Sequence, residues 1–589
     1  METDTVFTYI KSQEVAWRTA RVPITGSYDW NMYEHIERCT NVANAKFNRG
    51  SNTDGVRPYS DIVSPIIDVA FRSEGFDVKD IVPFVDSEDD YYLSFFVKKY
   101  HPQWARKHEL DTFIDEVVES SVIYDLVLVK NVNDRRPEVV DLSTLAFCDQ
   151  TNIMAGPICI KHQYTPSELV EFKGKWNADK IDMAILMSME EKKVALANDQ
   201  TVKTPSKYIE VYELRGTLPK RWLDTTAELF EYSPQMHIVC YYTDNKGAKQ
   251  GITLFEGKDK PLSDNFKALK IDISRSKGRA CGRSIVERLF EPQVWHNYAG
   301  IKLKEMLDSA VNILQTDSEE FGNQKISSLK NNTVLKHEPG RPITRIDMQL
   351  QNVPALQNFQ ITKENEARTL GSASEASLGK NPVSGTPFAL QSLIVQQGQG
   401  IHEYRQGKIA TFFADVLYRD WILYWLVQDL NSQESFSEIL SLEELQEIAE
   451  TISENKTNAR AKEMILSGEL VTREDLASFK EFSTGEFMKG GSRKFFKDFK
   501  DAFKDLPVKV LINVAGKQKD LAGNADKITN ILREVMRNPQ AFSQIPGVAK
   551  VFNELLESSG LSPIDFTMIT TAPAQTPNTF PQEVIPSVA

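Results

Sequence analysis

One string in this chain comes near the spacing of a catalytic motif without completing it. GIHEYRQGKI, residues 400–409, has the glycines and the lysine of a phosphate-binding loop, but six residues separate its glycines and Ile409 stands where a Mg²⁺-binding hydroxyl is needed. His402 lacks the second histidine four residues later that a zinc-binding helix requires. The chain also has no Gly-x-Ser-x-Gly nucleophile elbow. We therefore interpret residues 400–409 as part of a helix and expect a protein that is not an enzyme.

Two places in the sequence have residue types that can bind a metal ion. Carboxylates gather within residues 86–90, and hard cations are held by several converging carboxylate oxygens. Acidic residues also favour the start of a helix, where they meet the positive end of its dipole. His296 lies in the middle of an apolar helical pattern, where a core histidine or a contact between subunits is commoner than a ligand. Residues 86–90 are therefore interpreted as a helix start and His296 as a core or subunit-contact residue, and no metal or cofactor is expected.

Basic side chains that suit a nucleic acid occur in two places. Lys380 begins KNPVSGTP, residues 380–387, a strong chain break with two prolines and a glycine. Residues 487–507 interleave six basic residues with phenylalanines, a pattern that binds nucleic acid through phosphate contacts and base stacking. Those phenylalanines also lie at helical spacing, and three aspartates offset the lysines. An amphipathic helix is therefore the preferred interpretation of residues 487–507.

Composition limits what else the chain does. Its 589 residues allow two to four domains, and 69 Lys and Arg against 82 Asp and Glu give a net charge of −13. A protein that grips DNA over its whole surface needs the opposite excess. The five cysteines are far apart, which indicates neither a disulfide framework nor a zinc site. The acidic N-terminus does not resemble a signal peptide, and the most apolar segment, residues 412–427, is too charged to span a membrane.

The pattern of apolar residues predicts a mostly helical α+β fold. Apolar stripes at helical spacing predict helices over residues 59–71, 89–100 and 110–122. Short β-branched and aromatic runs then predict a β-rich region over residues 121–274, with a helical interruption near residues 167–196.

The second half of the chain is dominated by long helices. Gly282 and Ser284 signal the start of a helix that runs to residue 314, with Pro292 inside it. Polar, turn-rich sequence follows, with strand candidates at residues 333–335 and 342–346, and then two more helices separated by residues 380–387. Residues 506–516 predict one apolar strand.

From residue 282 onward the chain resembles the portal proteins of tailed double-stranded DNA bacteriophages. The resemblance is carried by GRSIVERLFEPQVWHNYAGIKLKEML, which starts a long helix after a Gly-x-Ser sequence, and by TLGSASEASLGKNPVSGTPFALQSL, a Gly-, Ser- and Pro-containing loop that leads into a very long helix. The order of elements is also similar over most of the chain. The resemblance implies a ring of twelve subunits at one capsid vertex of the virion, assembled in the host cytoplasm, through which the genome is packaged and ejected.

The resemblance also implies a division of the chain into the parts of a portal subunit. These are a wing (residues 1–281), a first stem helix (282–314), a clip (315–351), a second stem helix (352–378), a tunnel loop (379–387), a long wing helix (388–430), a C-terminal wing part (431–526, with the strand 506–516), a crown (527–570) and a proline-rich tail (571–589). The implied partners are further copies of the chain, double-stranded DNA, the major capsid protein, the terminase motor and a tail adaptor. No membrane partner is expected.

Two groups of residues are the candidate sites of such a ring. The tunnel loop would bring a few side chains near the DNA; they are Lys380, Asn381, Pro382, Val383, Ser384 and Gly385. Large aromatic residues on the long helices offer more apolar surface than one subunit easily hides, which is typical of a symmetric assembly. The candidates for the subunit interface are Trp295, Phe412, Trp421 and Trp425. A DNA-processing packaging enzyme, and an adaptor or scaffold that binds only proteins, are the alternatives.

Overall fold

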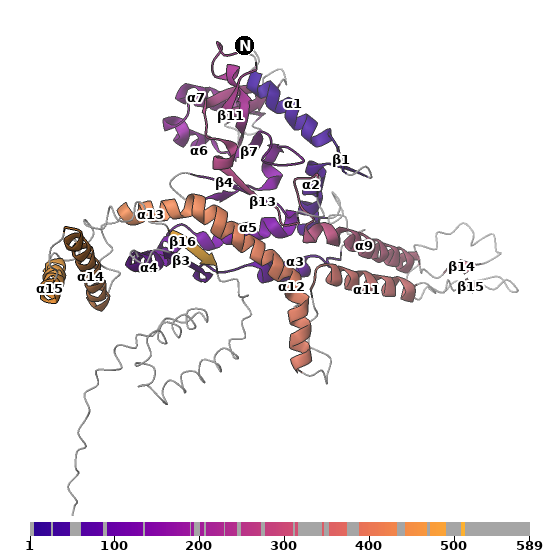
Figure 1. The fold of residues 1–589 in the computed structure, drawn as a ribbon. Helices are drawn as coiled ribbons and strands as arrows, with labels where there is room; N and C mark the ends of the chain where they lie inside the picture. Colours follow the sequence, from indigo (N-terminus) through magenta and orange to yellow (C-terminus); the bar gives the residue numbers. More distant parts are fainter. Residues whose placement is uncertain are drawn as a thin grey trace, which may run out of the picture.

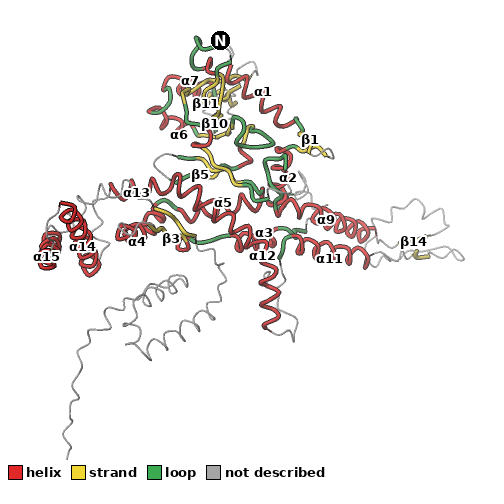
Figure 2. Tube along the Cα trace, in the orientation of Figure 1, coloured by secondary structure: helices red, strands yellow, loops and turns green. Residues whose placement is uncertain are grey.

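The structure of the chain is a computed structural model (Figure 1). It describes residues 5–24, 28–46, 60–85, 91–132, 136–188, 190–193, 201–204, 208–228, 230–243, 249–272, 277–309, 313–315, 344–346, 353–373, 388–432, 442–467, 472–489 and 508–512. The fold is α+β and mostly helical, as the sequence predicts, and Figure 2 shows the strands concentrated in one part of the molecule.

Five helices in the N-terminal part of the chain contribute to the main core. They are α1 (Thr5–Thr19), α2 (Met32–Ala43), α3 (Ser64–Glu74), α4 (Tyr91–Lys107) and α5 (Leu110–Tyr124). The helices predicted at residues 59–71, 89–100 and 110–122 are therefore confirmed as α3, α4 and α5, with their ends shifted by a few residues.

Helix α5 lies at the centre of this core. Phe113, Ile114, Val117 and Val118 recur at helical spacing and expose none of their surface. Phe113 also packs edge-on against Phe413, a residue of the second half of the chain, with ring centres 5.5 Å apart. The core is thus built jointly by segments from both halves of the sequence.

The β-rich region forms a five-stranded antiparallel sheet in the order β12-β11-β10-β7-β6. Its strands are β6 (Leu145–Phe147), β7 (Ile158–Tyr164), β10 (Ile209–Pro219), β11 (Tyr232–Thr243) and β12 (Lys249–Lys258). Because successive residues of a strand point to opposite faces, Val211 packs under α6 (Pro166–Glu171) and α7 (Ala178–Met187), whereas Tyr212 faces the main core. The predicted helical interruption is therefore the pair α6 and α7.

Smaller sheets complete the β structure. β4 (Val127–Lys130), β5 (Glu138–Val139) and β13 (Phe266–Leu269), which follows the short helix α8 (Leu262–Asn265), form a three-stranded sheet below the large one. Two further antiparallel pairs are β1 (Val22–Ile24) with β2 (Tyr28–Trp30), and β8 (Glu190–Lys193) with β9 (Thr201–Thr204).

The C-terminal strand returns to the N-terminal part of the fold. β16 (Val508–Ile512) pairs antiparallel with β3 (Ile81–Val85), with Val508 opposite Val85 and Ile512 opposite Ile81. The strand predicted at residues 506–516 is confirmed over these five residues.

Two antiparallel helices extend from the body as a hairpin. They are α9 (Ile285–Ser309) and α11 (Val353–Leu370), and Figure 1 shows them side by side, pointing away from the core. The prediction that the first helix reaches residue 314 is wrong, because α9 ends at Ser309 and residues 313–315 form β14 (Ile313–Gln315). β14 pairs with β15 (Thr344–Ile346), which confirms the strand candidate at residues 342–346, whereas residues 333–335 lie outside the described residues.

The long helix predicted over residues 388–430 is observed as one continuous helical run. It consists of α12 (Phe388–Phe412), a π-helical segment (Phe413–Ile422) and α13 (Leu423–Ser432). The backbone N–H of Leu423 donates to the carbonyl of Tyr418, five residues earlier, as π-helical hydrogen bonding requires. The π-helical segment was not predicted, because its apolar spacing resembles that of an ordinary helix.

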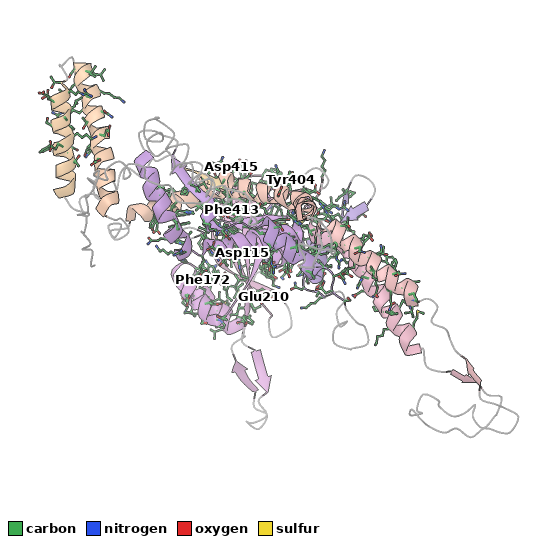
Figure 3. The ribbon with its side chains drawn as sticks, turned by 90° about the horizontal axis from the view of Figure 1, so that it is seen from below. Asp115, Phe172, Glu210, Tyr404, Phe413 and Asp415 are labelled. Carbon is green, nitrogen blue, oxygen red and sulfur yellow. The ribbon has the colours of Figure 1, made fainter. Side chains whose placement is uncertain are left out.

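A second helical pair lies at the opposite end of the molecule from the hairpin. It is formed by α14 (Leu442–Ser467) and α15 (Arg473–Lys489), and Figure 3 shows the two pairs at opposite ends in the view from below. Among the helices that the structure describes, none is long and apolar enough to cross a membrane.

His101 joins α4 to the π-helical segment. Its Nε2 atom lies 2.9 Å from the hydroxyl oxygen of Tyr418, and the imidazole exposes 2% of its surface. Burial lowers the pKa of His101 from 6.5 to about 4, because the charged form loses its hydration inside the core.

Lowering the pH from 7 to 5 is expected to reduce the free energy of unfolding by about 1–2 kcal/mol through His101 alone. The pKa of this group is lower in the folded chain than in the unfolded one, so the unfolded chain binds more protons between pH 6.5 and 4. Stability is therefore lost as the pH falls through that window. Urea unfolding at both pH values measures the change, and His101→Gln, which does not titrate, should show a correspondingly smaller loss. An equal loss in the variant would contradict this assignment.

Candidate functional site

The α9–α11 hairpin is held together by a reciprocal contact between two residues. The backbone carbonyl of Gln360 accepts a hydrogen bond from His296 Nδ1 at 3.2 Å, and the Gln360 side chain donates to the carbonyl of His296 at 3.4 Å. A Cβ atom at Gly300 would lie 3.0 Å from Gln360 Nε2, so the glycine allows the helices to approach closely. His296 is thus a buried structural residue, which confirms the interpretation drawn from the sequence.

The base of the hairpin is fastened to the segment that precedes α3. The side chain of Gln293 accepts from the backbone N–H of Ile62 and donates to the carbonyl of Ser60, at 3.0 and 2.7 Å. Asn297 Oδ1 accepts from the backbone N–H of Ser60 at 3.0 Å, and His296 Nε2 lies 3.1 Å from the Ser60 hydroxyl. The backbone groups of Ser60 and Ile62, which belong to no helix or strand, form hydrogen bonds in this way. These contacts fix the direction of the hairpin.

The hairpin also carries three large aromatic rings that remain partly exposed. Trp295 exposes 47% of its surface, Tyr298 50% and Phe359 37%. The ring of Trp295 contacts those of Tyr298 and Phe359 edge-on, with centres 5.9 and 6.4 Å apart. We call these three rings the hairpin aromatic cluster. Aromatic side chains grouped at a surface are typical of protein–protein interfaces.

The first turn of α9 is fixed by a buried arginine. Arg279 donates two hydrogen bonds to the carboxylate of Glu287, at 3.0 and 2.6 Å, and donates to the carbonyls of Cys281 and Gly282. Burial raises the pKa of Glu287, but hydrogen bonds from Arg279 outweigh it and the pKa is lowered. The hydroxyl of Ser284 accepts from the backbone N–H of Glu287 at 2.9 Å, which confirms the helix start signal at this serine.

The long helix is joined to the core by a buried group of charges. Arg405 Nε donates to Glu74 at 2.8 Å, its Nη1 donates to Asp125 at 2.6 Å, and its Nη2 donates to the carbonyl of Ser121 at 2.8 Å. His402 Nδ1 lies 3.1 Å from the same Glu74 oxygen. Glu74 and Asp125 expose none of their surface, and Arg405 exposes 4%. We call Arg405, Glu74, Asp125 and His402 the buried charge cluster.

The charges of this cluster depend on one another. Burial, with a smaller contribution from the nearby Asp272 carboxylate, raises the pKa of Asp125, although Arg405 opposes that effect. Burial disfavours the charged form of Arg405, but the attraction of Glu74 and Asp125 prevails and raises its pKa. Asp125 also accepts from the backbone N–H of Asp272 at 2.9 Å. The cluster therefore connects α12, α3, the end of α5 and the strand-to-helix connection that leads to α9.

Gly282 completes this junction. Its backbone N–H donates to the carbonyl of Asp125 at 3.3 Å, and a Cβ atom at this position would overlap the carboxylate of Asp125. The sequence suggests Gly282 only as part of a helix start signal. The structure gives the additional reason for a glycine, which is the close approach of a buried carboxylate.

The four predicted interface residues have different surroundings. Trp295 is half-exposed and belongs to the hairpin aromatic cluster, and Trp425 is partly buried. Phe412 and Trp421 each expose 5% of their surface and pack in the core of this same chain. Their apolar character is accounted for by that core, so they offer almost no surface to a second subunit.

The predicted tunnel-loop residues lie outside the described residues. They are Lys380, Asn381, Pro382, Val383, Ser384 and Gly385. The acidic residues 86–90 and the basic-aromatic residues 490–507 also lie outside them. Within the described ranges, no three His, Cys, Asp or Glu side chains gather in a way that would hold a metal ion.

The buried charge cluster escaped the sequence analysis. His402 and Arg405 belong to the string that resembles a phosphate loop, and Gly400 to Ile409 is indeed helical, as interpreted. A charged residue in a helix normally faces water, and Glu74 is 331 residues away from Arg405 in the sequence. No local signal connects the two residues.

Of the comparisons with known proteins, only the one with solved structures gives matches. No protein-family model matches this chain, and no curated protein matches it. Among solved structures, 58 chains match. One of them belongs to a structure described as "Neck of empty GTA particle computed with C6 symmetry"; it is 10% identical, the alignment covers 78% of this chain and 100% of that chain, and the TM-score is 0.29. The function proposed below therefore rests on the residues and elements of this chain.

Proposed function

We propose that this chain is a structural subunit of a virion, and more specifically the portal protein of a tailed double-stranded DNA bacteriophage. In this proposal twelve copies form a ring at one capsid vertex, and the genome passes through its channel during packaging and ejection. The chain itself is not an enzyme. A separate terminase motor docks on the ring and supplies the energy for packaging. A tail adaptor docks on the ring later, and the major capsid protein surrounds the ring.

The observation that carries the proposal is the succession of elements after residue 282. The helical hairpin of α9 and α11 extends from the body and has the small β14–β15 pair between its helices, and the long run α12 to α13 follows and returns across the core. The resemblance to portal proteins in the sequence rests on the same succession. A portal subunit would contain all of these elements in this order: a helix, a small turn-rich module, a second helix and a long helix.

The charge of the chain supports a conduit rather than a clamp. Each phosphate that a protein neutralises adds affinity for DNA, and strong affinity would slow a strand that has to move. A chain of net charge −13 keeps non-specific affinity for DNA low in a ring of many copies. The hairpin aromatic cluster supports self-assembly, since it is apolar surface that the subunit leaves open.

The oligomeric state of the purified full chain tests the proposal directly. Native mass spectrometry is expected to give a species of about twelve times the chain mass of 66.8 kDa, and negative-stain class averages should show a ring with a central hole. A stable monomer or dimer at micromolar concentration would contradict a ring that forms by itself. Nuclease or ATPase activity in the same preparation would favour a DNA-processing enzyme instead.

A further inference from the structure

The π-helical segment, Phe413–Ile422, interrupts the α winding of the long helical run for ten residues. In proteins, π-helical hydrogen bonding is rare, appears mostly as single turns inside α-helices, and is frequent at functional sites. Here α12 leads directly into the segment and α13 follows it without a break. The segment is therefore a long local departure from α winding, and contacts elsewhere in the fold must stabilise it.

The buried side chains of the segment show what π winding achieves. Phe413 and Ile422, at its two ends, expose none of their surface. In an α-helix of 3.6 residues per turn, the nine steps from the first to the second make about two and a half turns, so the two side chains would point in opposite directions. A π-helix has more residues per turn, and the same nine steps make about two turns. The π winding thus brings both side chains to one face of the helix.

Two polar contacts hold the segment to different parts of the core. The hydroxyl oxygen of Tyr418 lies 2.9 Å from His101 Nε2 on α4. Two residues later, an oxygen of Asp420 lies 2.7 Å from Lys267 Nζ on β13. Both partners are distant in the sequence, so tertiary contacts rather than a local signal stabilise the π winding.

Open space lies beside the end of the segment. A cavity of about 730 Å³ is lined on the helix side by Trp421, Tyr424 and Trp425. Tyr424 exposes 57% of its surface, and Trp425 is partly buried. The side chains of α13 on this side therefore have room to take a second position.

We propose that residues 413–422 are a conformational switch between π and α winding, which turns and shifts α13 relative to α12. In the α state each backbone N–H would donate to the carbonyl four residues before it instead of five. An α-helix turns and rises more per residue, so the run would lengthen and α13 would rotate, a movement of the kind that switching proteins use. Asp429 on α13, now 3.0 Å from Lys107 on α4, would leave that ion pair.

Deletion of Asp415 tests whether the core accepts α winding. This aspartate is exposed in the middle of the segment (Figure 3). A deletion in an α-helix rotates all following side chains by about 100°, whereas a π-helical segment can absorb it by becoming α-helical. The unfolding temperature of the deletion variant is therefore expected within about 5 °C of that of the parent chain.

The matched control deletes Asp115, an exposed aspartate in the middle of the α-helix α5 (Figure 3). Val117 and Val118, which follow it, are fully buried and would be rotated away from their places in the core. This deletion is expected to lower the unfolding temperature by more than about 15 °C or to prevent folding.

Hydrogen–deuterium exchange of the full chain measures the interconversion itself, whatever the oligomeric state. Each change of winding opens the backbone hydrogen bonds, so amides of residues 413–422 are expected to exchange at least about 10-fold faster than those of residues 402–411. Deletion of Asp415, which fixes the α winding, should remove this difference. Tyr418→Phe combined with Asp420→Asn removes both polar contacts and should raise exchange further, whereas Arg419→Met, at the exposed position between them, should not.

Three results would overturn the proposal. The first is an Asp415 deletion that unfolds the chain as the Asp115 deletion does, because the core would then not accept α winding. The second is equal exchange of residues 413–422 and 402–411 in the parent chain. The third is unchanged exchange in the variant that lacks both polar contacts, because those contacts would then not hold the π state. The switch lies within one subunit, so each of these results leaves the proposed ring untested and unaffected.

Discussion

Replacing Arg405 with methionine is expected to lower the free energy of unfolding by about 3–5 kcal/mol. The arginine exposes 4% of its surface and is the cation between Glu74 and Asp125, which expose none. Methionine fills a similar volume but leaves two carboxylates inside the core without their charged partner. Urea unfolding of the full chain measures the loss.

Two comparisons separate this charge effect from simple loss of packing. Arg419→Met removes an exposed arginine, paired with Asp420, from the same helical run and should change stability by less than about 0.5 kcal/mol. Adding Glu74→Gln and Asp125→Asn to Arg405→Met removes the unpaired charges and should recover a large part of the loss. A loss below about 1 kcal/mol for Arg405→Met would show that the cluster does not hold α12 to the core.

Removing two rings of the hairpin aromatic cluster is expected to weaken ring assembly while leaving the subunit folded. Trp295→Ala with Phe359→Ala deletes two large rings that the subunit leaves partly exposed, and aromatic residues of this kind contribute about 2 kcal/mol or more to an interface. The loss is repeated at every subunit contact of a closed ring, so even a modest change per contact should shift the equilibrium to smaller species. Native mass spectrometry over a range of concentrations measures this shift.

The control for this experiment is an exposed aromatic residue elsewhere. Phe230 exposes 84% of its surface just before β11, and Phe230→Ala should assemble like the parent chain. Circular dichroism should show that all variants keep their helical content. Rings of unchanged size and concentration dependence in the double variant would assign the interface to another surface.

The elements with strong local patterns could be predicted from the sequence. Helix α5 follows from the apolar spacing of residues 110–122, and strand β16 follows from the apolar run predicted over residues 506–516. The end of α9 could not be placed, because the apolar pattern continues past Ser309 into β14. A short strand that pairs with a distant segment has no periodicity that distinguishes it from the last turn of a helix.

Residue type alone does not tell which of the candidate interface residues are exposed, and the role of Trp295 in an interface stays a prediction. Trp295 stands out as a large aromatic residue on a long helix, and the structure leaves it half-exposed. Trp421 has the same sequence signature, yet it lies in the π-helical segment and is buried in the core beside Lys267. The sequence shows which residues are apolar, but contacts with segments distant in the sequence decide which of them face outward.

The pairing of β3 with β16 has a consequence for synthesis of the chain. The ribosome releases residues 81–85 long before residues 508–512, their only strand partner among the described elements. During that interval β3 is an apolar edge with unpaired backbone groups, which is the kind of surface that chaperones bind and that promotes aggregation. Completion of this strand pair therefore waits for synthesis of residues 508–512, so a subunit truncated before residue 508 would retain an open edge.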